Sequence, residues 1–534
     1  MGTSKYLSVL AFAIALALQA GLAQTAPVTP PAGTNPPPAA GQGRPPMAPV
    51  GVPVLGTPFV HDPSTVVRFH GKYYVYSTGR GAPFYSSLDG ETWTREGSVF
   101  QADPSVATDG YQGAIPEAVH AAVPKNNGSD VWAPDIVRLN GQFYLYYAVS
   151  SWGSFQSAIG LATNPVLDPK DPAYKWTDRG VVVGSNGAED LNAIDPGVIS
   201  APDGTLWICY GSYHGSIRVT QLDPKTGLAL RPKELGAPVA TARESEASDI
   251  IFHDRFYYLF VNHGSCCKGK ASEYNIRVGR SRTITGPYLD KHGEPMEKGG
   301  GSLFLAAHDH RIGPGHFGLL IDYDLEQKTP GDDVEAAAAQ RFSLHYEADL
   351  TRGGRSVLDI RPLLWSLDGW PVAGDNLADG TYQIVSRKSE NTLESHVPTV
   401  PPPPPPAGTP PPRGPVQDVP GTPIGPAAPR MTRYLALDNQ RWAIAPAGGG
   451  FYKIVNLGTG DAIGTPSDGD HAAVGLAVYT GADGQLWRLD QFPDGGYRIL
   501  NKATGMSLTA TGSNGVAASE FVRDDLHLWT VTTP

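Results

Sequence analysis

The stretch WAPDIVRLNGQFYLYYAV, residues 132–149, places an aspartate beside proline before an apolar run, an Asn-Gly turn and an alternating aromatic run. Two β-prone runs joined by Asn-Gly are typical of a β-hairpin. The same order recurs in HDPSTVVRFHGKYYVYST (61–78), IDPGVISAPDGTLWICYG (194–211) and EASDIIFHDRFYYLFVN (246–262). The chain therefore contains a repeated antiparallel unit.

The spacing of these units indicates the fold. Their acidic residues lie 73, 60 and 51 residues apart, at Asp62, Asp135, Asp195 and Glu246. A fifth unit fits between GPGHFGLLI at 313–321 and LLWSLDGW at 363–370. Repeats of this size, each a small antiparallel sheet, are typical of propeller blades. We therefore predict an all-β chain with a five-bladed β-propeller over residues 52–372. A long β-sandwich is the alternative, which the unequal loops disfavour.

A different repeat follows, over residues 373–534. Three segments open with tyrosine (GTYQIVSRKSENTLES, GFYKIVNLGTGDAIG and GGYRILNKATGMSLTA), and three strands close around Trp442, Trp487 and Trp529. These lobes resemble ricin-type β-trefoil lectins, so we expect a β-trefoil with the Pro-rich tract at about 397–430 inserted in lobe one. Such lobes usually hold a sugar-binding aspartate shortly after the opening strand. Here the first lobe has the carboxylate of Glu394 at that position, whereas the other two lobes have Gly464 and Thr509. The trefoil either binds carbohydrate weakly or only completes the structure.

The N-terminal segment has the layout of a secretory signal. One lysine precedes an apolar run that ends in small residues, which predicts a signal peptide over 1–23, with a membrane anchor as the alternative. A Pro-rich linker over 24–51 follows. We expect a secreted or periplasmic protein that is not membrane-bound after cleavage and is a monomer. The 534 residues carry a net charge of −11, which disfavours a nucleic-acid partner. Three cysteines do not form a disulfide framework, and Cys266 and Cys267 are either a vicinal disulfide or two reduced thiols.

The recurring carboxylates suggest chemistry. The innermost strand of each propeller blade lines a central channel, so an acidic residue at the start of each such strand faces one cavity. Crowded carboxylates repel, and one of them is pushed toward its protonated form. Glycoside hydrolysis needs such a pair, one carboxylate acting as base and one carboxylic acid as proton donor. The alternative is that each residue caps a turn, as Asp beside Pro often does.

A family resemblance supports hydrolysis. The motifs HDPS, WAPDI, NAIDPGV, YGSYHGSI, CCKGKASEYNIRVGRS and GPGH occur in the order found in endo-1,5-α-L-arabinanases of glycoside hydrolase family 43. The resemblance covers roughly residues 52 to 372 and implies a five-bladed propeller that hydrolyses arabinan with inversion. It implies Asp62 as general base, Asp195 as the residue that orients the acid and tunes its pKa, and Glu246 as general acid.

The same resemblance implies further site residues. Asp135 is assigned to structure or substrate positioning, and His316 to a largely water-coordinated cation, expected to be calcium. The remaining expected substrate-binding residues are His61, Trp132, Trp152, Asn192 and Ser212. A core role is an equal alternative for Trp132.

One residue departs from the family pattern. Where the family commonly has proline after Glu-Ala, this chain has Ser248 and then Asp249. Strict alternation along a strand predicts that Asp249 lies on the face opposite Glu246 and has no direct role. Two other functions stay open. One is an exo-acting arabinofuranosidase or β-xylosidase on the same fold, and the other is a non-catalytic carbohydrate-binding propeller–lectin.

Overall fold

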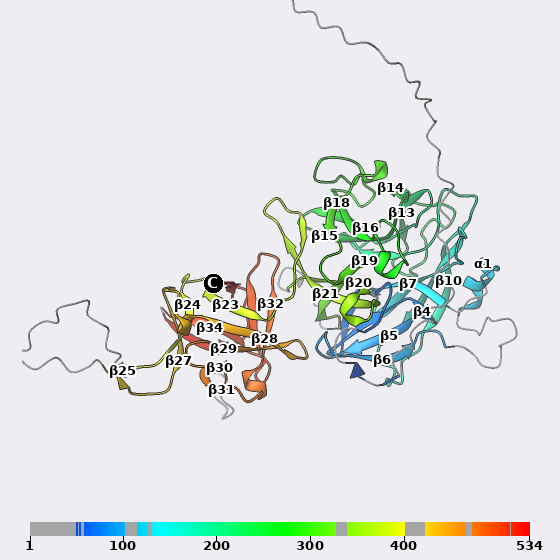
Figure 1. The fold of residues 1–534 in the computed structure, drawn as a ribbon. Coiled ribbons are helices and arrows are strands. Elements are labelled where there is room, and N and C mark those ends of the chain that lie inside the picture. Colours follow the sequence, from blue (N-terminus) through cyan, green and yellow to red (C-terminus); the bar gives the residue numbers. More distant parts are fainter. Residues whose placement is uncertain are drawn as a thin grey trace, which may run out of the picture.

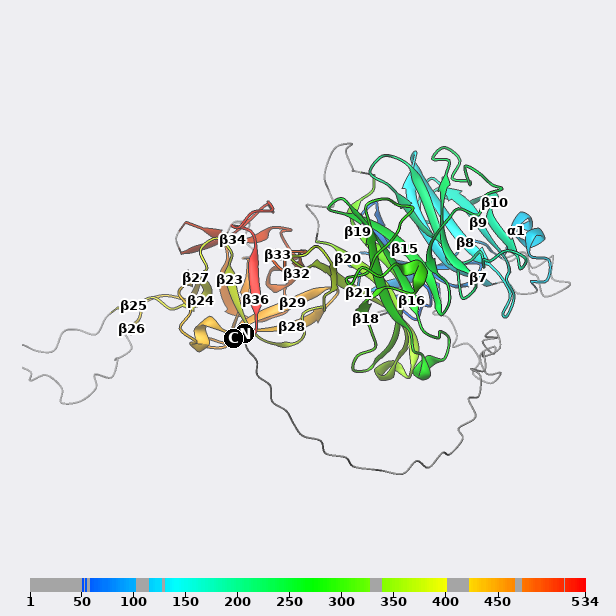
Figure 2. The ribbon, with the colours of Figure 1, turned by 90° about the horizontal axis from the view of Figure 1, so that it is seen from above.

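The computed structural model describes residues 50–51, 53–54, 58–101, 115–126, 130–326, 339–400, 422–465, 473–512 and 514–534. The predicted signal peptide lies outside these residues, and so does nearly all of the N-terminal linker. The chain forms two β-sheet domains that lie side by side, the first coloured blue to green and the second yellow to red (Figures 1 and 2). The predicted all-β fold, a propeller followed by a trefoil, is confirmed.

The described strands of the first domain form four sheets, and the largest of these, with nine strands, supplies two of the five blades. Blade 1 contains β1 (Pro53–Val54), β2 (Val66–Phe69), β3 (Lys72–Tyr76), β5 (Pro83–Ser87) and β6 (Trp93–Ser98). Blade 2 contains β4 (Gly79–Arg80), β7 (Asp130–Leu139), β8 (Gln142–Val149), β9 (Gln156–Asn164) and β10 (Thr177–Asn186). Blade 3 contains β11 (Gly197–Ser200), β12 (Leu206–Tyr210), β13 (Ser216–Leu222) and β14 (Ala237–Thr241).

Blade 4 contains β15 (Ser245–His253), β16 (Phe256–His263), β17 (Asn275–Ser281) and β18 (Ser302–Leu305), and blade 5 contains β19 (Arg311–Asp324), β20 (Arg341–Asp349), β21 (Arg355–Trp365) and β22 (Pro371–Ala373). The α-helix α1 (Glu117–Ala122) packs on β9 and β10. Blades 1 and 5 meet through parallel pairing of β2 with β19, which closes the ring. In the opening stretch, Asn140 and Gly141 both have positive φ, as a type I′ hairpin turn requires.

The second domain consists of three similar lobes. Its main sheet contains β23 (Gly380–Ser386), β24 (Thr392–His396), β27 (Ala428–Thr432), β28 (Trp442–Gly448), β29 (Phe451–Asn456), β30 (Asp461–Gly464), β31 (Gly475–Val478), β32 (Trp487–Gln491), β33 (Tyr497–Asn501), β34 (Ser507–Thr511), β35 (Gly515–Ser519) and β36 (Trp529–Thr532). The indole N–H groups of Trp442, Trp487 and Trp529 donate to the backbone carbonyls of Leu393, Ile463 and Leu508, respectively. One buried tryptophan therefore performs the same packing and hydrogen-bonding role in each lobe.

The strands around the Pro-rich tract show where it leaves the domain. β24 and β27 pair directly, and beyond them β25 (Thr399–Val400) pairs with β26 (Thr422–Pro423). Residues 401–421 lie outside the described residues. Because its two flanks pair with each other, the tract begins and ends within one lobe of the trefoil.

The two domains contact each other through charged and apolar groups. Asp322 of β19 lies 3.6 Å from the Arg498 guanidinium of the trefoil and accepts a hydrogen bond from Tyr73. Phe492 of the trefoil packs with Ala339, and the Trp365 N–H donates to the carbonyl of Pro493. None of the described helices is both long and apolar enough to cross a membrane.

Candidate active site in the propeller channel

The inner strand of every blade enters the channel through one residue with positive φ. These residues are Asp62, Ala133, Asp195, Ala247 and His316, with φ between 43° and 59°. Three positions after each of them, one residue lines a channel cavity of about 580 Å³: Thr65, Ile136, Val198, Ile250 and Leu319. The five inner strands therefore share one local conformation, and it defines equivalent positions.

This equivalence corrects the predicted ring of four carboxylates. Asp62 and Asp195 occupy the left-handed position itself, together with His316. Glu246 precedes the left-handed Ala247, whereas Asp135 follows Ala133 by two residues. The prediction of one shared blade position for all four acids is therefore wrong, because matching by composition ignored this kink.

The same kink overturns the expectation for Asp249. The register of β15 against β16 shifts between Glu246 and Asp249, so period-two alternation does not hold across them. Asp249 lines the channel cavity, is 5% exposed and occupies the position of Asp135 in blade 2. The alternation behind the predicted orientation is therefore wrong, whereas the expectation that Asp249 has no direct role stays a prediction, because Asp62, Asp195 and Glu246 do not line this cavity.

Asp62 lies among imidazole rings. Its Oδ1 is 2.8 Å from His61 Nδ1 and 3.5 Å from His316 Nδ1, and its Oδ2 accepts a hydrogen bond from the Thr78 hydroxyl. Burial alone would raise the pKa of Asp62, but His61 and His316 outweigh it and hold the pKa well below its usual value. Asp62 is therefore an ionised carboxylate.

Glu246 has the opposite electrostatic environment. It is 7% exposed, and its Oε2 accepts a hydrogen bond of 2.6 Å from Ser212. Burial, reinforced by the charge of Asp195, raises the pKa of Glu246 well above its usual value. Burial likewise raises the pKa of Asp195 to about 6. The site thus pairs an ionised carboxylate with a protonated one, the combination that acid–base hydrolysis requires.

Asp135 ties three blades together. Its two oxygens accept backbone hydrogen bonds from Thr65 of blade 1 (2.9 Å) and Val198 of blade 3 (2.8 Å). Since both oxygens are bonded to neighbouring blades, the geometry favours the structural role of Asp135 over substrate positioning.

The other predicted substrate-binding residues divide into two groups. Asn192 and Ser212 are buried and bonded to protein groups, Asn192 to Ser157 and Ser212 to Glu246. Trp152 is 48% exposed, and its ring lies 5.6 Å from that of the half-buried Trp132. The aromatic pair is therefore accessible at least through Trp152, while Trp132 also packs against the core of blades 2 and 3.

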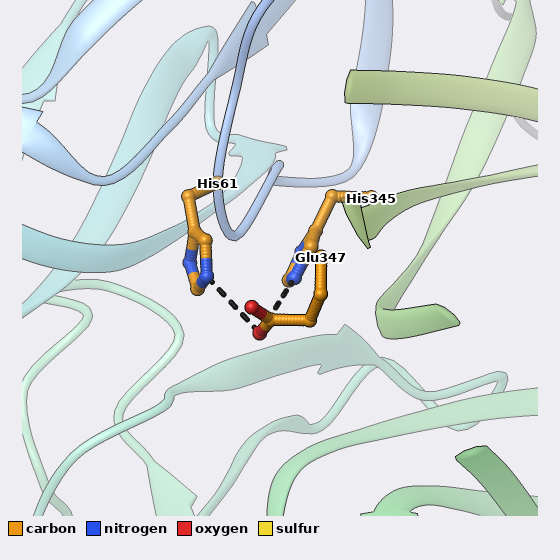
Figure 3. A group of neighbouring side chains, drawn as sticks. All are labelled: His61, His345 and Glu347. Atoms are coloured by element: carbon orange, nitrogen blue, oxygen red, sulfur yellow. Dashed lines mark hydrogen bonds and ion pairs between the residues drawn. The ribbon is translucent and has the colours of Figure 1, made fainter. Parts of the chain in front are cut away.

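His61 joins two residues that the sequence did not single out. Its Nε2 lies 3.2 Å from Glu347 Oε1, and His345 Nε2 lies 3.5 Å from the same oxygen (Figure 3). Glu347 and His345 come from SLHYEADL in β20, which lacks the acid-beside-proline pattern of the other motifs. Only the closure of blade 5 against blade 1 brings them to Asp62.

His316 is 7% exposed, and its backbone N–H donates to Asn262 Oδ1. Calcium prefers six to eight oxygen ligands, and His316 adds one imidazole nitrogen beside the Asp62 carboxylate. This donor set fits a cation that keeps most of its water. In the described chain, His316 is not part of the three-donor group His61, His345 and Glu347.

Two local structures bear on open expectations. Cys266 and Cys267 form a vicinal disulfide, and the backbone N–H of Cys266 donates to the hydroxyl of Tyr213. In the trefoil, the Glu394 carboxylate is 2.6 Å from the Arg430 guanidinium and accepts a hydrogen bond from Gln440. Its oxygens are thus already engaged by protein groups.

Comparisons with known proteins agree with this geometry. Residues 52–371 match the family described as Glycosyl hydrolases family 43, and residues 438–523 match the Ricin-type beta-trefoil lectin domain-like family. An extracellular exo-α-(1→5)-L-arabinofuranosidase of Cellvibrio japonicus is 36% identical over 60% of this chain and 88% of its own. An extracellular endo-α-(1→5)-L-arabinanase of Bacillus subtilis is 34% identical over 58% of this chain and 87% of its own.

Solved structures show the same similarity. An exo-1,5-α-L-arabinanase from a bovine ruminal metagenomic library is 36% identical, with a TM-score of 0.51 over 60% of this chain and 97% of its own. A Cellvibrio cellulosa α-L-arabinanase complexed with arabinohexaose is 31% identical, with a TM-score of 0.51 over 59% of this chain and 96% of its own. The chain belongs to glycosyl hydrolases family 43 through its propeller, to which a ricin-type β-trefoil domain is joined.

Proposed function

We propose that this protein is a secreted arabinan hydrolase that cleaves internal α-1,5-L-arabinofuranosidic bonds with inversion of the anomeric carbon. The observation that carries the proposal is a pair of buried carboxyl groups in different surroundings: Asp62 lies against His61 and His316, which lower its pKa, whereas Glu246 has Ser212 as partner and a raised pKa. The relatives support the substrate, because one is named an α-(1→5)-L-arabinofuranosidase and the other an α-(1→5)-L-arabinanase. They also support secretion, since both are named extracellular.

The proposed reaction is a single displacement. The ionised Asp62 removes a proton from a water molecule while the water oxygen bonds to the anomeric carbon. The glycosidic C–O bond breaks, and the leaving oxygen takes the proton of Glu246. Asp62 ends protonated and Glu246 ionised, and proton exchange with solvent restores both groups. Inversion requires the two carboxyl groups to be about 6.5–9.5 Å apart, which leaves room for the water.

Asp195 orients the acid. Its Oδ2 accepts the backbone N–H of Ala247, the residue next to Glu246, and its charge helps keep the Glu246 proton in place. His316 would hold a hydrated cation, most simply calcium, which would supply positive charge near Asp62. The catalytic steps above use only the protein's own groups and water.

The mode of cleavage has a specific second candidate. Relatives with nearly equal sequence identity to this chain are named for exo and for endo action. Exo cleavage is therefore the main alternative to endo cleavage. Time-resolved product analysis on linear, debranched arabinan decides between them. Internal cleavage releases a broad range of oligosaccharides and lowers viscosity early, whereas exo cleavage releases one short product from the start.

The same assay tests the broader assignment. Hydrolysis of a β-xyloside with no action on arabinan would assign the protein as a β-xylosidase in place of an arabinan hydrolase. Binding of arabinan without any product would favour the non-catalytic propeller–lectin.

A further inference from the structure

Glu347 is a buried carboxylate at the catalytic centre. Its side chain is 3% exposed, and one of its oxygens, Oε1, faces both His61 Nε2 and His345 Nε2 (Figure 3). Burial raises the pKa of a carboxyl, but His61 and His345 outweigh it here and hold the pKa of Glu347 far below its usual value. A buried, ionised group of this kind needs partners that repay its desolvation.

A metal centre is the first alternative. His61, His345 and Glu347 offer three donor atoms within 4.8 Å of one another. However, His345 Nδ1 accepts a hydrogen bond of 3.1 Å from the backbone N–H of Asp62, so this nitrogen carries no proton. A neutral imidazole then carries its proton on Nε2, the atom that faces Glu347. That nitrogen has no lone pair free for a metal. It faces Glu347 Oε1 at 3.5 Å without a hydrogen bond, whereas His61 Nε2 is hydrogen-bonded to the same oxygen at 3.2 Å.

The two rings reach different parts of Asp62. His61 places Nδ1 2.8 Å from the Asp62 carboxylate and Nε2 3.2 Å from Glu347, so each ring nitrogen faces a carboxylate oxygen. His345 instead accepts the Asp62 backbone N–H. The two rings lie in contact, with centroids 4.2 Å apart and planes tilted by 30°.

Asp62 needs such support because its backbone is strained. Its φ of 50° lies in the left-handed region, which residues other than glycine rarely adopt. A hydrogen bond to its backbone N–H stabilises this conformation, and the contact with His61 fixes its carboxylate. Both interactions depend on rings whose outer nitrogens point at one oxygen of Glu347.

We propose that Glu347 is a positioning residue for the general base: it orients His61 toward the Asp62 carboxylate, and its charge stabilises the His345 tautomer that receives the Asp62 backbone N–H. The proposal deepens the proposed function and rests on it for its kinetic part. Glu347 is shielded from solvent, so its removal acts on Asp62 through His61 and His345 and takes away no group that reaches the sugar directly.

The kinetic experiment compares Glu347→Gln and Glu347→Ala with Asp349→Asn. Asp349 lies on the same strand and bonds Thr351, which makes it a matched control. We expect Glu347→Ala to lower kcat on linear arabinan about 10- to 100-fold, less than the roughly 10²–10⁴-fold of a lost general base because Asp62 itself remains, with KM within about twofold. Glu347→Gln keeps an acceptor oxygen and should recover part of that loss, and Asp349→Asn should leave kcat unchanged. A rise in KM at unchanged kcat, or no change in any Glu347 variant with a native melting curve, would overturn the proposal.

An NMR experiment tests the geometry without activity. In protein labelled with ¹⁵N-histidine, we expect one neutral ring protonated on Nε2 (His345) and one ring protonated on both nitrogens (His61), assigned through His345→Gln and His61→Gln. Glu347→Gln, which conserves volume and is the variant expected to fold, should perturb both signals. Unchanged signals would overturn the proposal, as would Zn²⁺ binding at one equivalent with loss of both ring protons. If the wild type proves inactive on arabinan, the proposed function fails while this arm still decides the role of Glu347.

Discussion

Asp195 Oδ2 accepts a 3.2 Å hydrogen bond from the backbone N–H of Ala247, which directly follows Glu246. The residue that raises the pKa of the acid electrostatically therefore also holds the peptide beside it. Ala247 is the left-handed residue of blade 4, and Asp195 is that of blade 3. The left-handed residues of two neighbouring blades are thus hydrogen-bonded to each other, and this bond positions Glu246 relative to Asp195.

The acid is tested by Glu246→Gln. Glutamine cannot supply a proton, so we expect kcat on debranched arabinan to fall about 10²–10⁴-fold or more, with little change in melting temperature. Glu244→Gln is the matched control, because Glu244 lies two residues away with a side chain 72% exposed, and it should stay within a few-fold of wild type. Comparable activity of wild type and Glu246→Gln would refute the assignment.

The pH dependence is tested by Asp195→Asn. Glu246 acts while protonated, so activity is lost as pH rises through its folded pKa, which lies well above its usual value. Asn keeps the acceptor for the Ala247 N–H but removes the charge that helps retain the proton. The basic limb of the residual kcat profile should therefore move to lower pH. A limb that stays in place would show that burial alone sets this pKa.

The aromatic pair of Trp152 and Trp132 predicts a division of roles. Trp152→Ala removes an exposed ring and should raise KM about fivefold with an unchanged melting temperature. Trp132→Ala also removes packing against the core of blades 2 and 3, so we expect about 2 kcal/mol of lost stability in addition. Denaturant melts and initial rates on arabino-oligosaccharides separate the two effects. Equal loss of stability in both variants would contradict this division.

Asp249→Asn should stabilise the protein at neutral pH. Burial, reinforced by Asp135, raises the pKa of Asp249, while in the unfolded chain the carboxyl ionises above about pH 4. Raising the pH from there toward the folded pKa favours the unfolded chain, so the wild type loses stability in that window. Asn removes this cost and can still accept the Ile250 N–H. The melting temperature should rise by about 2 °C or more at pH 7 and converge with wild type near pH 4. A constant difference across this range would contradict the explanation.

Cation removal tests His316. EDTA should lower activity or melting temperature, added Ca²⁺ should restore it, and His316→Ala should abolish the response. A wild type indifferent to EDTA in both measurements would remove the cation from the proposal.

Several features follow from local sequence alone. Asn140-Gly141 between two β-prone runs fixes a hairpin, and its recurrence revealed the blades before any tertiary information. The evenly placed Trp442, Trp487 and Trp529 indicated the trefoil in the same way, because each fills the same buried site in its lobe. Periodicity and turn chemistry are short-range properties, so they can be read directly from the chain.

Only the tertiary structure decided which residues meet in the channel. The left-handed kink at Ala247 is invisible to period-two alternation, and Asp249 beyond it lines the channel cavity. Glu347 lies 286 positions from His61, and only ring closure through β2 and β19 brings them together. The sequence by itself determined the repeated strands and the candidate acids, whereas protonation and contact depend on burial and on neighbours supplied by other blades.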